Sequence, residues 1–215
     1  MGDQMCGTCA RPALVTAPEP AEGMRSGKMR LAQVPQELQL TRRSNVPDIF
    51  LFAPGKHESH VRELFAEYLT WAKSRLDEEF GITFDIDAML DEGMAELDKF
   101  APPHGRLLIG WTGAEAAGCA CLRKIGEGTA EIKRMYVRPA HRGKGVGRAL
   151  LEAVILEGRS AGYSRIRLDT AGFMKEAQAL YRAFGFRPIE PYPESEIPAA
   201  FWRHWQFMEL QLHPS

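Results

Sequence analysis

Little in this sequence points to a membrane, a disulfide framework or a nucleic-acid-binding protein. No apolar run is long enough to cross a bilayer, and the first residues lack the charged start and apolar stretch of a secretion signal. Four cysteines in 215 residues are too few for a disulfide scaffold, and 27 Lys and Arg balance 28 Asp and Glu. These absences predict a cytoplasmic protein with neither a membrane nor a nucleic-acid partner.

The first part of the chain lacks a hydrophobic period. From Met1 to about Asn45 it is rich in Pro, Gly and Ala, so residues 1–46 are expected to form a flexible extension and residues 47–213 one domain. Cys6 and Cys9 have the spacing of half a zinc site, but no second Cys/His pair follows them. We therefore expect two free thiols and no metal.

The remaining chain alternates between strand and helix patterns. Apolar periodicity and turn residues predict strands near residues 48–52, 106–111, 116–123, 130–137, 166–168 and 207–212. Helices are expected over residues 61–76, 87–100 and 145–162, and around residues 177–184. This order predicts an α+β fold with a mixed, largely antiparallel central sheet flanked by helices.

A glycine-rich loop carries the clearest chemical signal. Gly143, Gly145 and Gly147 lie between a predicted strand and a predicted helix, where main-chain N–H groups can converge on an anion. Six basic residues and no carboxylate fall between positions 133 and 148: Lys133, Arg134, Arg138, Arg142, Lys144 and Arg148. The spacing fits neither a P-loop nor a dinucleotide-binding fingerprint. A polyphosphate ligand is therefore predicted, with a ligand-free glycine turn as the alternative.

The sequence Arg142-x-x-Gly145-x-Gly147 resembles the Gln/Arg-x-x-Gly-x-Gly/Ala pattern of the GNAT superfamily. Residues 132–137 look like the family's fourth strand, residues 168–170 like its fifth, and residues 177–186 like its last helix and following strand. The resemblance implies a transferase of the acyltransferase class that uses acetyl-CoA as co-substrate, an N-acetyltransferase.

The resemblance also implies positions for the coenzyme. Pantetheine would lie like a strand beside Met135, Tyr136 and Val137, and a strand bulge there would present an N–H to the oxyanion. The pyrophosphate would be held by the N–H groups of the loop: Arg142, Gly143, Lys144, Gly145, Val146, Gly147 and Arg148. Lys133, Arg138 and Lys144 are candidates for the 3′-phosphate, with solvated surface charges as the alternative.

Two residues take the family's catalytic positions. Glu131 matches the general base of its protein-acetylating branch, with a structural ion pair as the alternative. Strand alternation would place Glu131, Lys133, Met135 and Val137 on one face, making Lys133 the expected partner. Tyr181 matches the tyrosine that donates a proton to the coenzyme A sulfur, with a core aromatic as the alternative.

Other polar residues receive structural interpretations. Asp169 and Thr170 are expected to cap the following helix, with a role in orienting substrate or cofactor as the alternative. His141 is expected on the surface of the loop.

The acceptor is constrained least. Specificity should reside in the first two helices and residues 188–205, where Glu190, Glu194 and Glu196 would attract a cationic amine or simply be solvated. Aromatic residues there cover a cleft, form a homodimer contact or pack in the core: Phe201, Trp202, Trp205 and Phe207. We expect a small amine or amino-acid-like acceptor; the alternatives are protein lysines or amino termini, and a non-catalytic acetyl-CoA sensor.

Overall fold

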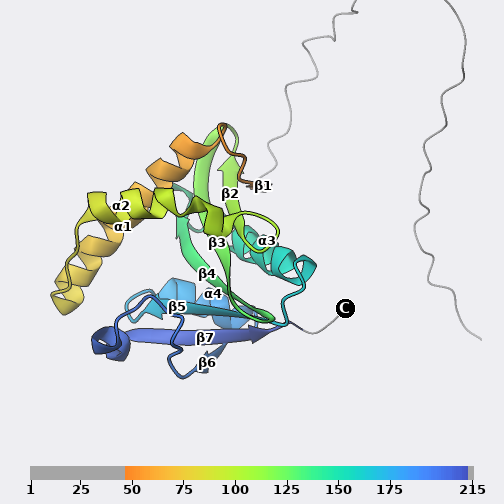
Figure 1. Cartoon of the computed structure of the whole chain (residues 1–215). Coiled ribbons are helices and arrows are strands. Elements are labelled where there is room, and N and C mark those ends of the chain that lie inside the picture. The colour runs from red at the N-terminus through yellow and green to blue at the C-terminus, as the bar shows by residue number, and fades with distance from the viewer. Residues whose placement is uncertain (1–46, 213–215) are drawn as a thin grey trace, which may run out of the picture. The chain divides into compact units, whose positions relative to one another are not determined.

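A computed structural model describes residues 47–212 of the chain. Seven strands form one sheet in the order β1-β2-β3-β4-β5-β7-β6 (Figure 1). Their bounds are β1 Asp48–Leu51, β2 Arg106–Thr112, β3 Glu115–Gly126, β4 Thr129–Val137, β5 Arg165–Ala171, β6 Arg187–Ile189 and β7 Trp205–Gln211. β4 and β5 pair in parallel, and every other neighbouring pair is antiparallel. The predicted fold class is therefore confirmed.

The helices begin and end where local chemistry favours it. They are α1 Glu58–Phe80, α2 Ile86–Ala95, α3 Val146–Ser160 and α4 Lys175–Ala183, with 3-10 helices η2 Leu97–Phe100, η3 Pro139–His141 and η4 Ala199–His204. Asp85 caps α2 by accepting a 3.0 Å hydrogen bond from the N–H of Ala88. Gly81 ends α1 in the left-handed conformation. The single helix expected over residues 87–100 is divided into α2 and η2.

Each face of the sheet has its own apolar core. On one face α3 and α4 pack over inward-pointing strand residues such as Leu122, Ile132 and Leu168. On the other, α1 and α2 cover a second cluster that includes Cys119 and Cys121. Each of these thiols is free and buried, and the two, which are two residues apart on β3, lie on the same face of the sheet.

The parallel pair at the centre of the sheet is short. β4 and β5 are in register only from Thr129 opposite Arg165 to Ile132 opposite Leu168, although β4 continues to Val137 and β5 to Ala171. Past Ile132 the two strands diverge, so that β2, β3 and β4 rise at a steep angle to β5 and β7 (Figure 1). Within the described residues, the edge of β4 from Lys133 to Val137 that faces β5 therefore has no strand partner.

A bulge interrupts β4 at the same place. Cys119 is opposite Tyr136 and Cys121 is opposite Lys133, so one residue of β3 faces two of β4, and Arg134 adopts a φ of 50°. The bulge resets the alternation: Met135 and Val137 pack with Ile132 on the α3 face, whereas Tyr136 belongs to the α1 face. The expectation that Met135 and Val137 share a face with Glu131 and Lys133 was wrong, because a strand pattern does not reveal an inserted residue.

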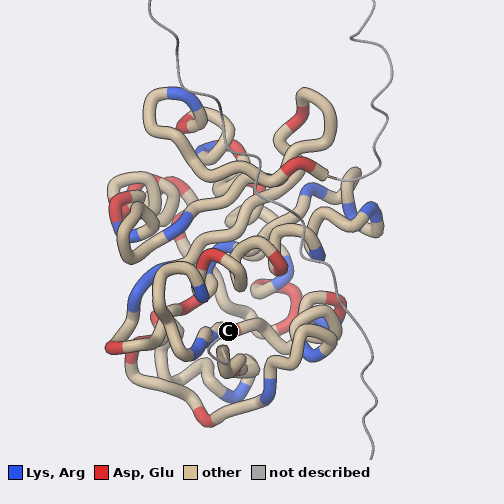
Figure 2. Tube along the Cα trace, turned by 90° about the vertical axis from the view of Figure 1, so that its right-hand side faces the viewer, with Lys and Arg blue, Asp and Glu red and all other residues tan. Residues whose placement is uncertain are grey.

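Basic and acidic residues are interspersed over the described trace (Figure 2). No helix between residues 47 and 212 combines the length and apolarity that a membrane crossing requires. The predicted extension over residues 1–46, with Cys6 and Cys9, lies outside the described residues.

Candidate active site

The glycine loop joins β4 to α3 and contains two left-handed glycines. Gly143 and Gly145 have φ values of 72° and 85°, and a Cβ built on either would meet no atom within 4 Å. The first N–H groups of any α-helix lack intrahelical acceptors. In the described residues, the Arg142 and Lys144 N–H groups donate to Pro139 O and His141 O, while Gly143, Gly145 and Val146 donate to no main-chain carbonyl outside a regular element. Main-chain N–H groups at the start of α3 are therefore left without a main-chain acceptor, which is the arrangement that binding of a phosphate group requires.

Gly147 lies on the side of α3 that faces the diverging strands. A Cβ there would lie 3.6 Å from Val137 Cγ2 and 3.7 Å from Leu180 Cδ2, which is ordinary contact. This glycine therefore places the first turn of α3 close to the free edge of β4 and to α4.

The basic residues around the loop have different partners. The Arg138 guanidinium is 2.8 Å from a Glu67 oxygen and 3.3 Å from Glu63, so carboxylates of α1 neutralise it. Lys133 is 3.1 Å from Asp169 on β5. Lys144 stays exposed. Of the three candidates for the 3′-phosphate, Lys144 alone lacks a carboxylate partner among the described residues.

Arg142 connects the loop to α1. Its Nε donates a 3.1 Å hydrogen bond to the carbonyl of Val137, and its guanidinium lies 5.3 Å from the centre of the Trp71 ring. His141 beside it is buried, with Nε2 3.1 Å from a Glu115 oxygen. The expected surface position of His141 was wrong, because the η3 turn folds its ring inward.

Tyr181 projects from α4 toward the free edge of β4. Its buried hydroxyl donates to Met135 Sδ at 3.6 Å. Burial, helped by Tyr68 and Asp169, raises the pKa of the phenol above its usual value, so the proton is retained at neutral pH. A thioether is a weak acceptor, so this proton is available to a stronger one placed beside Met135.

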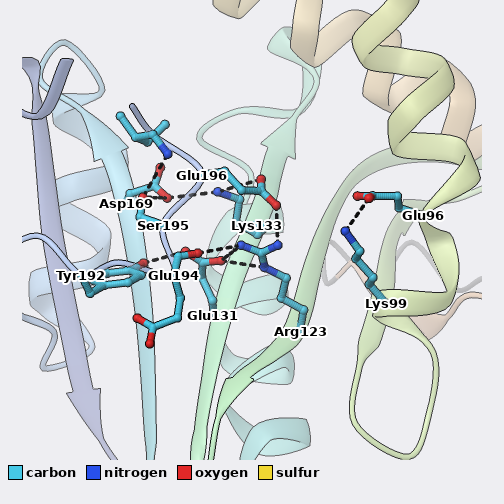
Figure 3. Close-up of polar contacts among 11 residues, drawn as sticks. Glu96, Lys99, Arg123, Glu131, Lys133, Asp169, Tyr192, Glu194, Ser195 and Glu196 are labelled. Carbon is cyan, nitrogen blue, oxygen red and sulfur yellow. Dashed lines mark hydrogen bonds and ion pairs between the residues drawn. The ribbon is translucent and has the colours of Figure 1, made fainter. Parts of the chain in front are cut away.

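Glu131 is completely buried on the opposite side of β4 (Figure 3). Arg123 of β3 donates to its Oε2 through Nε at 2.8 Å and lies 2.6 Å away through Nη2, and the Tyr192 hydroxyl donates to Oε1 at 2.7 Å. Burial raises the pKa of the Glu131 carboxyl, against the opposing charges of Lys133 and Arg123. Both oxygens are thus occupied, and this geometry favours the structural ion pair over the general base, with Arg123 as the direct partner.

A segment distant in sequence covers this part of the sheet. Residues 190–198, here called the strap, follow β6 without regular secondary structure. Arg123 binds the Glu194 carbonyl at 3.2 Å and pairs with the Glu196 carboxylate, which also lies 3.4 Å from Lys133 Nζ (Figure 3). The strap is therefore fastened to β3 and β4 by two cations.

Asp169 lies directly after Leu168, the last residue of β5 that pairs with β4. Its Oδ2 accepts from Lys133 Nζ at 3.1 Å and from Ser195 Oγ of the strap at 3.5 Å. The expected capping role was wrong, because α4 begins after Met174 and no side chain caps it. Asp169 is instead part of the polar network beneath the strap.

Aromatic side chains line the region between α1 and the strand ends. Trp71 and Phe80 of α1 lie 5.8 Å and 6.2 Å from the ring of Phe173, which follows β5. Tyr68 lies 6.0 Å from Tyr136 of β4. These rings connect α1 with β4 on one side and with the residue after β5 on the other. Some of them are partly exposed, and the others are buried.

The residues that sequence reasoning missed are Arg123 and Tyr192. They lie 8 and 61 positions from Glu131, so no local pattern connects them to it. Phe207 is buried as core packing predicts, whereas Trp202 and Trp205 are half-buried and line a separate cavity of about 320 Å³. Residues 47–212 contain no group of three or more His, Cys, Asp or Glu arranged to hold a metal ion.

Comparison with known proteins gives a consistent result. The model of the acetyltransferase (GNAT) family matches residues 60–186. An uncharacterized N-acetyltransferase of Schizosaccharomyces pombe is 37% identical over 123 residues, which are 56% of this chain and 76% of that protein. The crystal structure of an acetyltransferase from Streptococcus agalactiae superposes with a TM-score of 0.61 at 21% identity, over 77% of this chain and 98% of that one.

A ligand-bound structure shares the fold as well. The PaiA N-acetyltransferase of Thermoplasma acidophilum, solved in complex with coenzyme A, superposes with a TM-score of 0.57 at 16% identity, over 77% of this chain and 99% of that one. The family model matches more than half of this chain, and the matched residues include the short parallel pair, the bulge and the glycine loop. The chain belongs to the GNAT family and is an acetyl-CoA-dependent N-acetyltransferase.

Proposed function

We propose that the chain transfers the acetyl group of acetyl-CoA to the amine of a small, amino-acid-like molecule. The divergence of β4 and β5 carries this proposal, because the free edge of β4 lies between the glycine loop and the Tyr181 hydroxyl. Pantetheine would add to that edge beside Met135, Tyr136 and Val137, and the N–H groups from Gly143 to Arg148, among which those of Gly143, Gly145 and Val146 are open, would hold the diphosphate. Acetyl-CoA supplies the acetyl group as a thioester.

In this proposal Tyr181 is the general acid. Its raised pKa keeps the phenol protonated, and its hydroxyl already points at a sulfur atom on β4. A departing thiolate needs a proton, and the buried phenol would donate it. The bulge at Arg134 turns the main chain of Met135 and Tyr136 out of register, which would direct an N–H at the developing oxyanion.

Glu131 has a positioning role in this proposal. It holds Arg123 and Tyr192, and through them the strap, in place over β4. Deprotonation of the acceptor then falls to another group or to binding of the neutral amine, because both oxygens of Glu131 are engaged.

The strap favours a small acceptor over a protein. A protein lysine or amino terminus would need an open groove across the sheet, whereas the strap is fastened over the central strands by Arg123 and Lys133. A free thiol assay with acetyl-CoA against amino acids, small amines and lysine peptides tests this proposal. Turnover with small amines is expected. Preference for peptides, or acetyl-CoA binding without release of coenzyme A, would contradict it.

A further inference from the structure

Beneath the strap lies a cluster of charged side chains in which two cations contact three carboxylates. Arg123 is paired with the fully buried Glu131, and Lys133 with Asp169, whose side chain is 10% exposed. Glu196 contacts both cations, although its own side chain is 49% exposed. Each cation therefore has a largely buried carboxylate of its own, and Glu196 is the shared, more exposed third.

We propose that the acceptor carries a carboxylate, which takes the place of Glu196 between Arg123 and Lys133 when the strap opens. This inference rests on the proposed acetyl transfer and names the acceptor class as an amine bearing a carboxylate, as in a free amino acid. Guanidinium and ammonium groups that already share one carboxylate are arranged to bind a second carboxylate in its place.

The charge balance supports a zwitterion. Two cations face the carboxylates of Glu131, Asp169 and Glu196, which leaves one negative charge in excess. A ligand carboxylate replacing Glu196 preserves this count, and the ammonium of the same ligand would neutralise the excess. An amine without a carboxylate would neutralise the excess negative charge but could not replace Glu196.

The position of the cluster suits such a ligand. Lys133 and Asp169 are the first residues beyond the paired part of β4 and β5, on the side of the divergence that faces the aromatic residues of α1. Arg123 also lines an open cavity of about 450 Å³ beside the connection from η2 to β2. The strap has no helix or strand to break when Glu196 moves away.

The test compares acceptors with and without a carboxylate, using the full chain. Each amino acid is paired with its amide and with its decarboxylated amine, and a dipeptide with a free carboxyl end separates a peptide terminus from a free amino acid. We expect loss of the carboxylate to lower kcat/KM at least about tenfold, since charge-assisted hydrogen bonds are lost.

Glu196→Gln removes the internal competitor. The KM for carboxylate-bearing amines should fall about two- to fivefold, the range of a partly exposed ion pair, while the KM for decarboxylated amines should not fall. Glu194→Gln is the matched control, because it removes the same charge from the strap but Glu194 contributes a main-chain carbonyl to Arg123. It should leave both values unchanged.

Calorimetric titration of the same compounds into the protein with coenzyme A present gives a reading independent of turnover. Equal use of amines with and without a carboxylate, a higher KM in Glu196→Gln, or no binding of any carboxylate-bearing amine would each overturn the inference. The proposed function fails in a different way, namely if the protein does not bind acetyl-CoA or acetylates no amine.

Discussion

The proposed donor side and the proposed acceptor side of this site are built in different ways. The donor side is a continuous segment from the end of β4 through the glycine loop to α3, and its expected contacts are main-chain groups fixed by backbone conformation. The acceptor side consists of side chains from β3, β4, β5 and the strap, brought together by ion pairs across up to 73 positions of sequence. A site built from main-chain groups can be recognised from a local glycine pattern in the sequence. A site built from side chains that are distant in sequence has no such local pattern.

The largest test of this contrast is Gly145→Asp. A carboxylate at a position with φ of 85° both strains the loop and repels a diphosphate, so we expect acetyl-CoA affinity to fall at least about a hundredfold. Gly162→Asp is the control, because Gly162 has φ of 82° and equally open surroundings after the other end of α3. Affinity measured by calorimetry should fall in the first variant and persist in the second; intact binding in Gly145→Asp would refute the donor site.

Tyr181→Phe tests the proton donor. Removing the hydroxyl should lower kcat about a hundredfold or more with little change in acetyl-CoA affinity, as for loss of a general acid. Steady-state kinetics with the best amine of the panel measures this effect. Tyr163→Phe removes a hydroxyl that donates to His104 O at 2.6 Å beyond the C-terminal end of α3, and it should keep full activity. Comparable kcat values in the two variants would exclude Tyr181 as the acid.

Glu131→Ala tests whether Glu131 has a structural role or acts as the general base. Breaking the buried pair with Arg123 should lower the free energy of unfolding by about 3 kcal/mol. Urea unfolding measures this loss, and Glu194→Ala should change stability by less than about 0.5 kcal/mol. A large fall in kcat with unchanged stability would instead restore Glu131 as the general base.

The buried phenols of the site predict a loss of stability at high pH. Burial raises the pKa of Tyr68, Tyr181 and Tyr192, so the folded state retains protons that the unfolded chain loses near pH 10. Their stabilising contribution is complete below about pH 10 and declines above it by about 1.4 kcal/mol per pH unit for each phenol. Unfolding of Tyr192→Phe at pH 8 and pH 11 should show a smaller alkaline loss than the parent; an equal loss would rule out this origin.

Most of the fold could be predicted because each element carries a local pattern. The helix expected over residues 145–162 is α3, Val146–Ser160, and the strands expected near residues 106–111, 116–123 and 130–137 are β2, β3 and β4. The glycine loop could be recognised from sequence because its structure depends on the backbone conformation of Gly145 and on residues adjacent to it in the chain. The order of β5, β7 and β6 is set by long-range pairing, for which the sequence carries no comparable signal.

The acceptor network could not be predicted for the same reason. Counting charge along the sequence gave an excess at residues 133–148, but carboxylates of α1, β5 and the strap neutralise Arg138 and Lys133. The inserted residue at Arg134 reversed the alternation after it, and its φ of 50° is not marked by a glycine. These features depend on the tertiary structure and not on periodicity.

The stacking of Arg142 on Trp71 gives the protein an optical signal of its own. Indole emission is sensitive to a cation above the ring, and this guanidinium belongs to the loop assigned to the diphosphate while the indole belongs to α1. We expect titration with coenzyme A to change the fluorescence of Trp71, and Trp71→Phe to abolish that change. The donor loop and the helix that borders the acceptor region can therefore be followed together, without a label, as the ligand arrives.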